Sequence, residues 1–309
     1  MKLNKLLIQS RLSESKVITT GIDSLDKMIG GLRIGHICTV AARPAMGKTT
    51  FALTVAKNIG IMNKIPTAIL SLEHNEDAVA KRLFAAEFGW KNIENKQTEV
   101  KSKMSNEMKK ASSLLRSVGF TSSQMDREEY LQKMKEAPVW IEHALNITVD
   151  EVICLVERMK KYNGIKVLII DGLAWLVTGM TYPEREQSML KLVQVADRLK
   201  IAILLTSDLT RDVEHRIGCR PQLSDLRGGF GTEIFSSVVM FIYRPSYYGI
   251  TEDILGDTEK IADIIVAKNN FGDVGDIRLS FSKQACFKDI ATTSPIVDDT
   301  FEAFSDSLF

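Results

Sequence analysis

Short apolar runs alternate with longer amphipathic stretches along this chain from about residue 35 onward. This alternation is typical of βαβ units, in which parallel strands form a sheet and helices cover both of its faces. It predicts an α/β fold with a largely parallel central sheet flanked by helices. The runs expected to form strands are residues 37–41, 67–72, 139–141, 167–170, 201–205, 238–243, 261–267 and 276–281.

The amphipathic stretches between these runs predict the helices. The clearest signal lies at residues 148–164, where Thr148 and Glu151 match a capping box and Gly164 can end the helix in a left-handed conformation. The apolar residues of this stretch fall on one helical face. The other main helices are expected at residues 48–58, 75–88 and 184–199.

Two segments do not follow the alternation. Residues 91–136 are rich in lysine and glutamate and have little strand character, so we expect a helical or partly mobile insertion outside the sheet. Residues 292–309 are acidic and polar, which is typical of a loose tail. These boundaries predict one domain at residues 19–291, preceded by a separate segment at residues 1–18.

The composition is that of an ordinary soluble globular chain. Of its 309 residues, 45% are hydrophobic and 26% are charged, which excludes global disorder and collagen-like structure. No apolar run approaches the roughly 20 residues that cross a membrane. The first 16 residues hold only a short apolar patch and no small-residue cleavage site, so they make a poor signal peptide. We therefore expect a cytoplasmic location and no membrane contact.

Net charge and single residue types narrow the function further. A formal net charge of +1 excludes a uniformly basic nucleic-acid coat, but it allows a local basic surface or a positive pore formed by assembly. The four cysteines and four histidines share no ligand spacing, so no zinc site is expected. Trp90, Trp140 and Trp175 have apolar neighbours and are expected in the core rather than as base-stacking platforms.

The sharpest chemical feature is the loop between the first predicted strand and its helix. A phosphate loop needs small residues whose backbone N–H groups wrap phosphate, a helix N-terminus, a lysine for the β and γ oxygens and a hydroxyl for Mg²⁺. Gly47, Lys48 and Thr49 supply its last three positions, although Ala42 replaces the usual first glycine. An incidental helix start is the alternative. The predicted nucleotide-binding residues of this loop are Ala42, Arg43, Pro44, Ala45, Met46, Gly47, Lys48, Thr49 and Thr50.

Two acidic residues follow other predicted strands, at the sheet edge where ligands bind in open α/β folds. Asp171 comes directly after residues 167–170, and with Thr49 it is the candidate to hold Mg²⁺. Its alternative is a helix or turn cap. Glu73 follows residues 68–72 and could polarise the attacking water as a general base. The alternative for Glu73 is a first-turn acid favoured by the helix dipole.

These residues and several further motifs match one family. The motifs occur in the order TGIDSLD (20–26), GGL (30–32), AARPAMGKTT (41–50), SLE (71–73), LIID (168–171), LSDLR (223–227) and FIYR (241–244). The chain closely resembles the C-terminal, RecA-like ATPase domain of the replicative DnaB-type DNA helicases, from about residue 19 to 281. This family commonly writes Ala-Arg-Pro before its Gly-Lys-Thr, as this chain does.

The resemblance implies a homohexameric ring that hydrolyses ATP with Mg²⁺ at subunit interfaces and moves along single-stranded DNA during replication, in contact with replication proteins. It implies Lys48 and Thr49 on phosphate and Mg²⁺, Asp171 in the metal shell and Glu73 as the catalytic carboxylate. Lys268 matches a lysine that acts on the neighbouring subunit's nucleotide. The DNA-binding residues implied for the central pore are Arg227, Gly228 and Gly229.

The chain also departs from the family. Asn270 stands where the family has an arginine finger, and Asp208 stands where it usually has a glutamine thought to link the γ-phosphate to the DNA loops. An asparagine cannot supply the positive charge of a finger, so turnover is expected to be slow. The alternative function is therefore a nucleotide-binding regulatory or scaffold protein with a degenerate site.

A third interpretation is a RecA-like ATPase of the recombinase or clock-protein kind. Proteins of that kind share the core but not the motif that this chain has at residues 223–227. The family's N-terminal collar domain is expected to be missing. Residues 1–12 are expected to be either a remnant of its linker helix or a frayed terminus.

Overall fold

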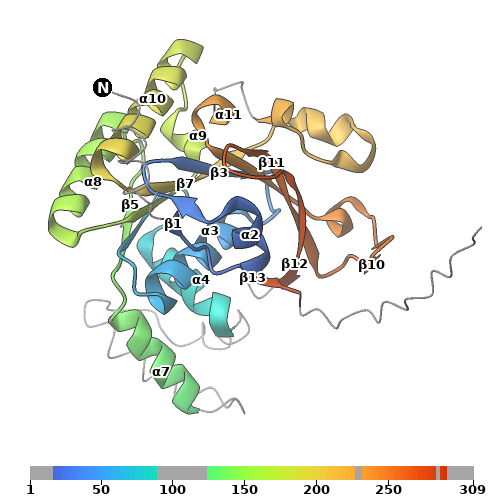
Figure 1. The fold of residues 1–309 in the computed structure, drawn as a ribbon, viewed down its shortest axis with the longest axis horizontal. Helices are drawn as coiled ribbons and strands as arrows, with labels where there is room; N and C mark the ends of the chain where they lie inside the picture. Colours follow the sequence, from blue (N-terminus) through green and yellow to red (C-terminus); the bar gives the residue numbers. More distant parts are fainter. Residues whose placement is uncertain (1–16, 89–123, 227–231, 283–285, 291–309) are drawn as a thin grey trace, which may run out of the picture.

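The structure is a computed structural model that describes residues 17–88, 124–226, 232–282 and 286–290. Its centre is a nine-stranded sheet in the order β13-β12-β11-β8-β3-β7-β6-β4-β5 (Figure 1). The strands of this sheet are β3 (Ile37–Ala42), β4 (Thr67–Ser71), β5 (Val139–His143), β6 (Val167–Asp171), β7 (Ala202–Asp208), β8 (Val238–Tyr243), β11 (Ile261–Asn269), β12 (Gly275–Ser282) and β13 (Cys286–Asp289).

The sheet has a parallel part and an antiparallel part. β5, β4, β6, β7, β3 and β8 run parallel, whereas β8, β11, β12 and β13 pair antiparallel in sequence. Every residue of β3, β4, β6 and β8 is buried, as expected for strands whose two faces are both covered. The predicted α/β class with a largely parallel sheet is confirmed, and all eight predicted strands are present within one to three residues of their predicted ends.

Helices cover both faces of the sheet (Figure 1). One hydrophobic core joins the sheet to α2, α3 and α4. A second core on the other face joins it to α8, α9 and α10. The bounds of these helices are α2 (Asp23–Ile29), α3 (Lys48–Ala56), α4 (Glu76–Phe88), α8 (Val149–Asn163), α9 (Leu173–Leu176) and α10 (Tyr182–Leu199).

Local sequence signals fix several helix ends. In α8 the Glu151 backbone N–H donates to the Thr148 hydroxyl, and the Thr148 N–H donates to the Glu151 carboxylate at 2.8 Å, so the predicted capping box is present. Gly164 follows in the left-handed conformation. A second capping box, Thr181 with Glu184, starts α10 two residues earlier than predicted.

The helix after the phosphate loop ends differently from the prediction. We expected it to end at residue 58, but α3 continues as the π-helix η1 (Lys57–Met62). Within η1, a Cβ atom on Gly60 would lie 2.4 Å from Val139 of β5. Only a glycine lets the extra turn approach the edge strand this closely.

The two ends of the domain meet at the short helix α2. The backbone N–H groups of Asp23 and Ser24, at the start of α2, donate to the Asp289 carboxylate at 2.7 and 3.1 Å. Asp289 is the last residue of β13. A carboxylate at a helix N-terminus satisfies free N–H groups and complements the helix dipole, so β13 stabilises α2.

Several small elements were not predicted because they are too short to show a periodicity. They are the antiparallel pair β1 (Val17–Ile18) with β2 (Leu32–Arg33), the hairpin β9 (Glu252–Asp253) with β10 (Gly256–Asp257), the helix α11 (Thr232–Phe235), and the 3-10 turns η2 (Arg211–His215), η3 (Ile217–Cys219), η4 (Leu223–Asp225) and η6 (Pro245–Tyr248).

The end of the predicted insertion is a packed helix, α7 (Gln124–Lys135). Tyr130 of α7 is buried against Phe84 of α4, and its hydroxyl donates to the Leu83 carbonyl oxygen at 3.4 Å. The rest of the insertion, the N-terminal segment up to residue 16 and the tail from residue 291 lie outside the described residues.

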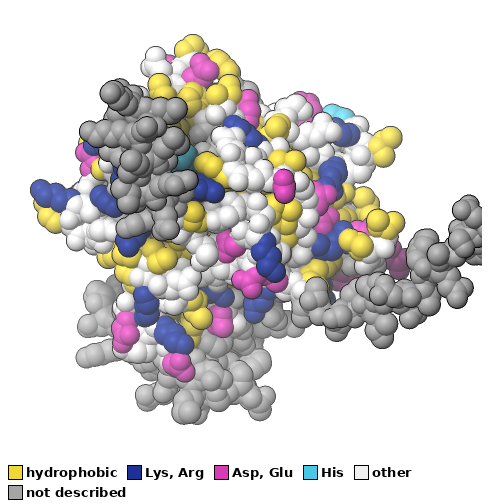
Figure 2. Space-filling view, viewed as in Figure 1, with side chains coloured by type: hydrophobic (Ala, Val, Ile, Leu, Met, Phe, Trp, Pro, Cys, Tyr) yellow, Lys and Arg dark blue, Asp and Glu magenta, His cyan; other side chains and the backbone are white. Residues whose placement is uncertain are grey.

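The surface agrees with a nearly neutral net charge. On the face shown in Figure 2, basic and acidic side chains of the described residues are mixed rather than gathered in separate areas. No helix among the described residues is both long enough and apolar enough to cross a membrane.

Candidate functional site

The carboxyl ends of the parallel strands meet at one edge of the sheet and form a cavity of about 590 Å³. The loop after β3, Glu73 after β4 and Asp208 at the end of β7 all reach it. This is the edge where open α/β sheets bind ligands. The cavity is lined by Pro44, Ala45, Gly47, Lys48, Thr49, Thr50, Glu73, His74, Arg82, Ala174, Trp175, Thr178, Asp208 and Phe281.

The backbone of the loop after β3 has the shape that a phosphate loop requires. Ala45 has φ 64° and Gly47 has φ 107°, so the chain turns twice through the left-handed region before α3 begins at Lys48. A Cβ on Gly47 would lie 3.1 Å from Phe281 and 3.2 Å from Phe287. Glycine is therefore required at residue 47 by its backbone conformation and by its neighbours.

The missing first glycine has a simple explanation. Ala42 is the last residue of β3, fully buried and paired in register with Asp208 of β7. Its backbone is not among those with positive φ. Because residue 42 keeps strand conformation, alanine fits there without strain.

Lys48 is held by three acceptors at the sheet edge. Its Nζ donates to the carbonyl oxygens of Ala42 at 3.0 Å and Arg43 at 3.5 Å. The same Nζ lies 2.8 Å from Oδ1 of Asp208. Only 13% of the Lys48 side chain and 22% of the Asp208 side chain are exposed. The phosphate-loop lysine thus forms a mostly buried ion pair with the residue that departs from the family pattern.

Two of the predicted loop residues point away from the cavity. Arg43 donates from Nε to Glu214 at 2.8 Å and from Nη1 to the Leu209 carbonyl oxygen at 3.0 Å. Met46 is buried in the hydrophobic core. These side chains tie the loop to the protein, so only the backbone atoms of Arg43 and Met46 can contribute to binding.

Asp171 is buried at the end of β6, with 3% of its surface exposed. Its Oδ1 accepts a hydrogen bond from the Thr206 hydroxyl at 2.9 Å, and that hydroxyl accepts one from the Gly172 N–H at 2.7 Å. Its Oδ2 has no hydrogen-bond partner among the described residues. A fixed carboxylate with one unpartnered oxygen matches the oxygen ligands that Mg²⁺ prefers.

Glu73 lines the cavity beside Trp175, which the prediction placed in the core. The Trp175 indole N–H donates to Glu73 Oε1 at 3.3 Å, and 59% of Trp175 is exposed. The core prediction was wrong for Trp175 because α9 is a single turn after β6, and its apolar neighbours Leu173 and Leu176 face the core instead. Trp140 is half-buried on β5, and Trp90 lies outside the described residues.

Sequence reasoning missed a pair of side chains beside the phosphate loop. Phe281 at the end of β12 lines the cavity, and the Arg244 guanidinium lies 4.2 Å from the centre of its ring. Arg244 also donates to the Ala45 carbonyl oxygen at 3.3 Å. Burial lowers the pKa of the Arg244 guanidinium from its ordinary value. Arg244 lay in a recognised motif, but no local pattern indicated that β12 would bring Phe281 to it.

Arg82 and His74 also line the cavity and were not predicted to take part. Arg82 belongs to α4, which follows the strand that carries Glu73. The only available signal was the position of Arg82 within the first turns of a helix that begins at the ligand-binding edge.

Lys268 lies at the opposite edge of the sheet. β8 runs parallel to β3 and β11 runs antiparallel to β8, so the end of β11 is beside the start of β8. There the Lys268 Nζ donates to the Glu233 carbonyl oxygen at 2.6 Å, and the Asn270 N–H donates to the Ser237 carbonyl oxygen at 2.9 Å. The structure therefore does not bring Lys268 to the cavity of its own chain.

The predicted DNA-binding residues Arg227, Gly228 and Gly229 lie outside the described residues, but the backbone that leads to them is described. Asp225 is buried and accepts two hydrogen bonds from Arg216 at 2.8 and 2.9 Å. Leu226 pairs with Leu209, which follows the cavity residue Asp208. The segment before Arg227 is thus firmly attached to the end of β7.

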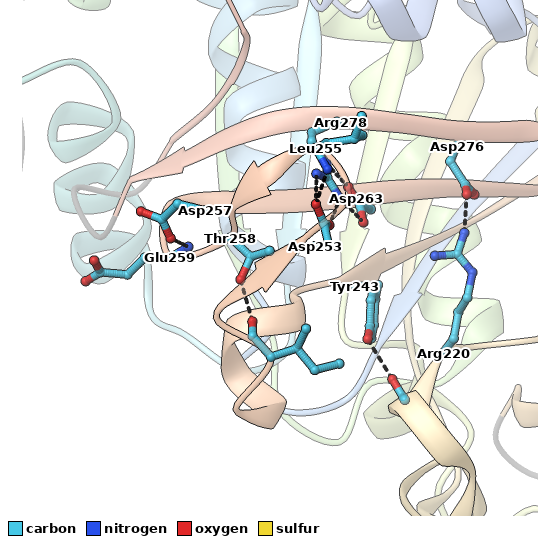
Figure 3. Close-up of polar contacts among 12 residues, drawn as sticks. Arg220, Tyr243, Asp253, Leu255, Asp257, Thr258, Glu259, Asp263, Asp276 and Arg278 are labelled. Atoms are coloured by element: carbon cyan, nitrogen blue, oxygen red, sulfur yellow. Dashed lines mark hydrogen bonds and ion pairs between the residues drawn. The ribbon is translucent and has the colours of Figure 1, made fainter.

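A second cavity, of about 370 Å³, lies near the β9–β10 hairpin. Figure 3 shows Arg278 of β12 between Asp253 and Asp263, and Arg220 bonded to Asp276. Hydrogen bonds from Arg278 lower the pKa of Asp253 to about 2. The arginines shown there bond to aspartates, so the charges that line this cavity neutralise one another.

Comparisons with known proteins agree on one family. A family model described as the DnaB-like helicase C-terminal domain matches residues 17–289. The replicative DNA helicase DnaC of Bacillus subtilis (strain 168) is 29% identical over 283 residues, which cover 90% of this chain and 57% of that protein. The replicative DNA helicase DnaB of Leifsonia xyli subsp. xyli (strain CTCB07) is 30% identical over 283 residues, covering 90% and 56%. The chain spans little more than half the length of these curated relatives.

Two solved structures share the fold. The first, an isolated ATPase domain, superposes with a TM-score of 0.75 at 25% identity, covering 93% of this chain and 97% of that domain. A DnaB-like replicative helicase, solved in a study of its interactions with primase, gives a TM-score of 0.76 at 25% identity and covers 93% of this chain and 67% of its own. The fold is therefore that of the RecA-like ATPase domains of DnaB-type helicases.

Proposed function

Because the chain belongs to the family of DnaB-like helicase C-terminal domains, we propose that it is an ATP-dependent DNA helicase or translocase that acts on single-stranded DNA during replication. The observation that carries this proposal is the cavity at the carboxyl edge of the sheet. The loop with left-handed residues Ala45 and Gly47 reaches this cavity, as does the N-terminus of α3. The cavity is also lined by Lys48, Thr49 and Glu73.

The residues of the cavity suit hydrolysis of a nucleoside triphosphate. The N–H groups at the start of α3 and the Lys48 ammonium bind the β- and γ-phosphates. The Thr49 hydroxyl in the cavity and Asp171 Oδ2, at the end of β6 between β4 and β7, would hold Mg²⁺, which would neutralise phosphate charge. Glu73 accepts a proton from the attacking water, and the Trp175 N–H orients its carboxylate. The Arg82 side chain adds positive charge on the same wall.

The nucleobase lies against Phe281. An aromatic face beside a phosphate loop, with a guanidinium 4.2 Å away, offers stacking and cation–π contacts to a flat heterocycle. The hydrogen bond from Arg244 to the Ala45 carbonyl oxygen fixes this platform relative to the loop.

The active oligomer is a homohexameric ring. Lys268 lies at the edge opposite the cavity of its own chain, so it reaches nucleotide only in a neighbouring subunit. Arg227, Gly228 and Gly229 from each subunit hold single-stranded DNA by its phosphates in the ring's channel. A ring of repeated loops gives a positive channel to a chain of net charge +1. Replication proteins are its partners, and the cytoplasm is its location.

One observation favours a second function, that of a nucleotide-binding scaffold with little turnover. The ion pair between Lys48 and Asp208 removes charge from the phosphate site. Asn270 also lacks the charge of an arginine finger. Both features slow hydrolysis while leaving the fold and the nucleotide cavity in place.

The test is steady-state ATP hydrolysis by the purified chain, with and without single-stranded DNA. Lys48→Ala is the control for contaminating ATPases. Hydrolysis that DNA stimulates and that Lys48→Ala abolishes is the expected result for a motor. Nucleotide binding without turnover in either condition would instead support the scaffold function, and equal activity in Lys48→Ala would refute the assignment of the site.

A further inference from the structure

Among the described residues, three acceptors surround the Lys48 ammonium, one for each of its N–H donors. An ammonium group has three N–H donors and no acceptor. The three groups within reach of Nζ are the carbonyl oxygens of Ala42 and Arg43 and the carboxylate of Asp208. A phosphate that bonds Lys48 must therefore replace at least one of them.

Of these three acceptors, Asp208 is the one that a bound phosphate would displace most readily. The Ala42 carbonyl oxygen is fixed by the pairing of β3 with β7, and the Arg43 residue is tied down by its side-chain bonds to Glu214 and Leu209. Asp208 is the only charged acceptor of the three. A phosphate oxygen beside Nζ comes close to the Asp208 carboxylate, and two negative charges at that separation repel. The carboxylate must turn away when phosphate binds.

The pairing of β3 with β7 positions this ion pair, unlike an ion pair between flexible side chains on the surface. Asp208 is the last residue of β7 and lies in register beside Ala42, whose carbonyl oxygen also holds Lys48. Both side chains are mostly buried, so water screens the attraction only partly.

We propose that Asp208 is a latch on the phosphate-binding lysine: its carboxylate holds Lys48 until the phosphates of a nucleoside diphosphate or triphosphate displace that carboxylate. This inference rests on the proposed function and adds a way of regulating the same site. The latch lowers nucleotide affinity, because only the molecules in which the Lys48–Asp208 ion pair is broken can bind phosphate. If the pair is closed about nine-tenths of the time, apparent affinity falls about tenfold.

Asp208 is also connected through its neighbour in the sequence to the segment before Arg227. Asp208 is followed by Leu209, whose carbonyl oxygen accepts a hydrogen bond from Arg43 and whose backbone pairs with Leu226. Leu226 immediately precedes Arg227 in the sequence.

The experiment compares the full chain with Asp208→Asn and Asp208→Gln by calorimetric titration with ADP, pyrophosphate and AMP in the presence of Mg²⁺. These ligands avoid ATP turnover. Asp212→Asn is the matched control, because it removes the same charge from an exposed residue four positions further along. Thermal melting of each variant checks that it folds, and the glutamine variant serves if the asparagine variant does not.

The expected result is that both Asp208 variants bind ADP and pyrophosphate about tenfold more tightly, whereas AMP binding and the Asp212→Asn variant do not change. AMP is spared because it lacks the β- and γ-phosphates that a phosphate-loop lysine binds. Unchanged or weaker ADP binding in both folded Asp208 variants, with binding lost in Lys48→Ala, would overturn the latch alone. ADP binding that is equal in the unmodified chain and in Lys48→Ala would overturn the proposed function, and the latch with it.

Discussion

The hydrogen bond from Trp175 to Glu73 orients the carboxylate proposed as the general base, so its removal should slow ATP hydrolysis. Trp175→Phe keeps an aromatic ring at this position. The Trp175 ring packs closely on Gly172, since a Cβ built on Gly172 would lie 3.1 Å from that ring and 3.4 Å from Glu73. The substitution removes the indole N–H that donates to Glu73 Oε1. We expect kcat for ATP hydrolysis to fall while nucleotide affinity stays the same, because Glu73 acts on water and not on the bound phosphates.

The expected loss is small for identifiable reasons. The N–H···O distance of 3.3 Å is long, and Trp175 is 59% exposed, so water replaces part of the lost bond. The ordinary net value of about 0.5–1.5 kcal/mol therefore applies rather than the higher value for bonds to charged groups. At about 1.4 kcal/mol per factor of ten, kcat should fall roughly two- to tenfold.

Steady-state hydrolysis with saturating single-stranded DNA measures kcat and KM, and ADP titration measures affinity. Trp140→Phe is the control, since Trp140 is a half-buried tryptophan on the edge strand β5 and does not line the cavity. A folded Trp175→Phe variant with unchanged kcat would show that Glu73 is oriented without the indole. A change in KM and ADP affinity alone would show that Trp175 contacts nucleotide instead.

Four further predictions concern other parts of the chain. Gly47→Ala should lower the free energy of unfolding by about 1–3 kcal/mol and abolish ADP binding, because the φ of residue 47 is 107° and Phe281 and Phe287 crowd the new methyl group. Urea titration measures the stability and calorimetry the ADP binding. An unchanged urea midpoint would contradict the backbone strain. Asn270→Arg should raise ATP turnover at least tenfold in the assembled ring if the missing finger charge limits the reaction, and no increase would remove that explanation. Arg227→Ala should weaken single-stranded DNA binding and reduce its salt dependence while sparing ADP affinity; equal DNA affinity at every salt concentration would exclude Arg227 as a phosphate contact. The folded-state pKa of Asp253 is lowered by Arg278 to about 2 from 3.8, so its stabilisation is present above pH 4 and lost as pH falls toward 2. The Tm deficit of Asp253→Asn should accordingly shrink over that interval, and a constant deficit would refute the linkage.

The parts of the fold that could be predicted from sequence are those with long, consistent patterns. β3, β6 and β8 are continuous apolar runs, and both faces of each are covered in the structure. The loop at residues 42–50 could be predicted as a candidate phosphate loop because the chemistry of phosphate binding fixes residue types within a short span. Both signals are local, so no knowledge of tertiary packing was needed to find them.

The features that could not be predicted depend on contacts between distant parts of the chain. Lys48 meets Asp208, and Arg244 meets Phe281, only because β3 pairs with β7 and the antiparallel strands extend the sheet beyond β8. Periodicity shows that a strand forms but not which strand lies beside it. The Trp175 error has another cause, because a one-turn helix is too short to show which of its sides faces the core.

The position of β3 in the sheet has a consequence for the order in which the protein can become functional during synthesis. β3 and the phosphate loop leave the ribosome early, but the strands on either side of β3 are β7 and β8, which are made much later. Until Val238–Tyr243 has emerged, β3 lacks one of its two neighbours, and α2 lacks its carboxylate cap until Asp289 is made. A nascent chain therefore carries the sequence for binding ATP long before it has the structure to do so, and the onset of nucleotide binding should mark near-completion of the whole domain rather than of its first half.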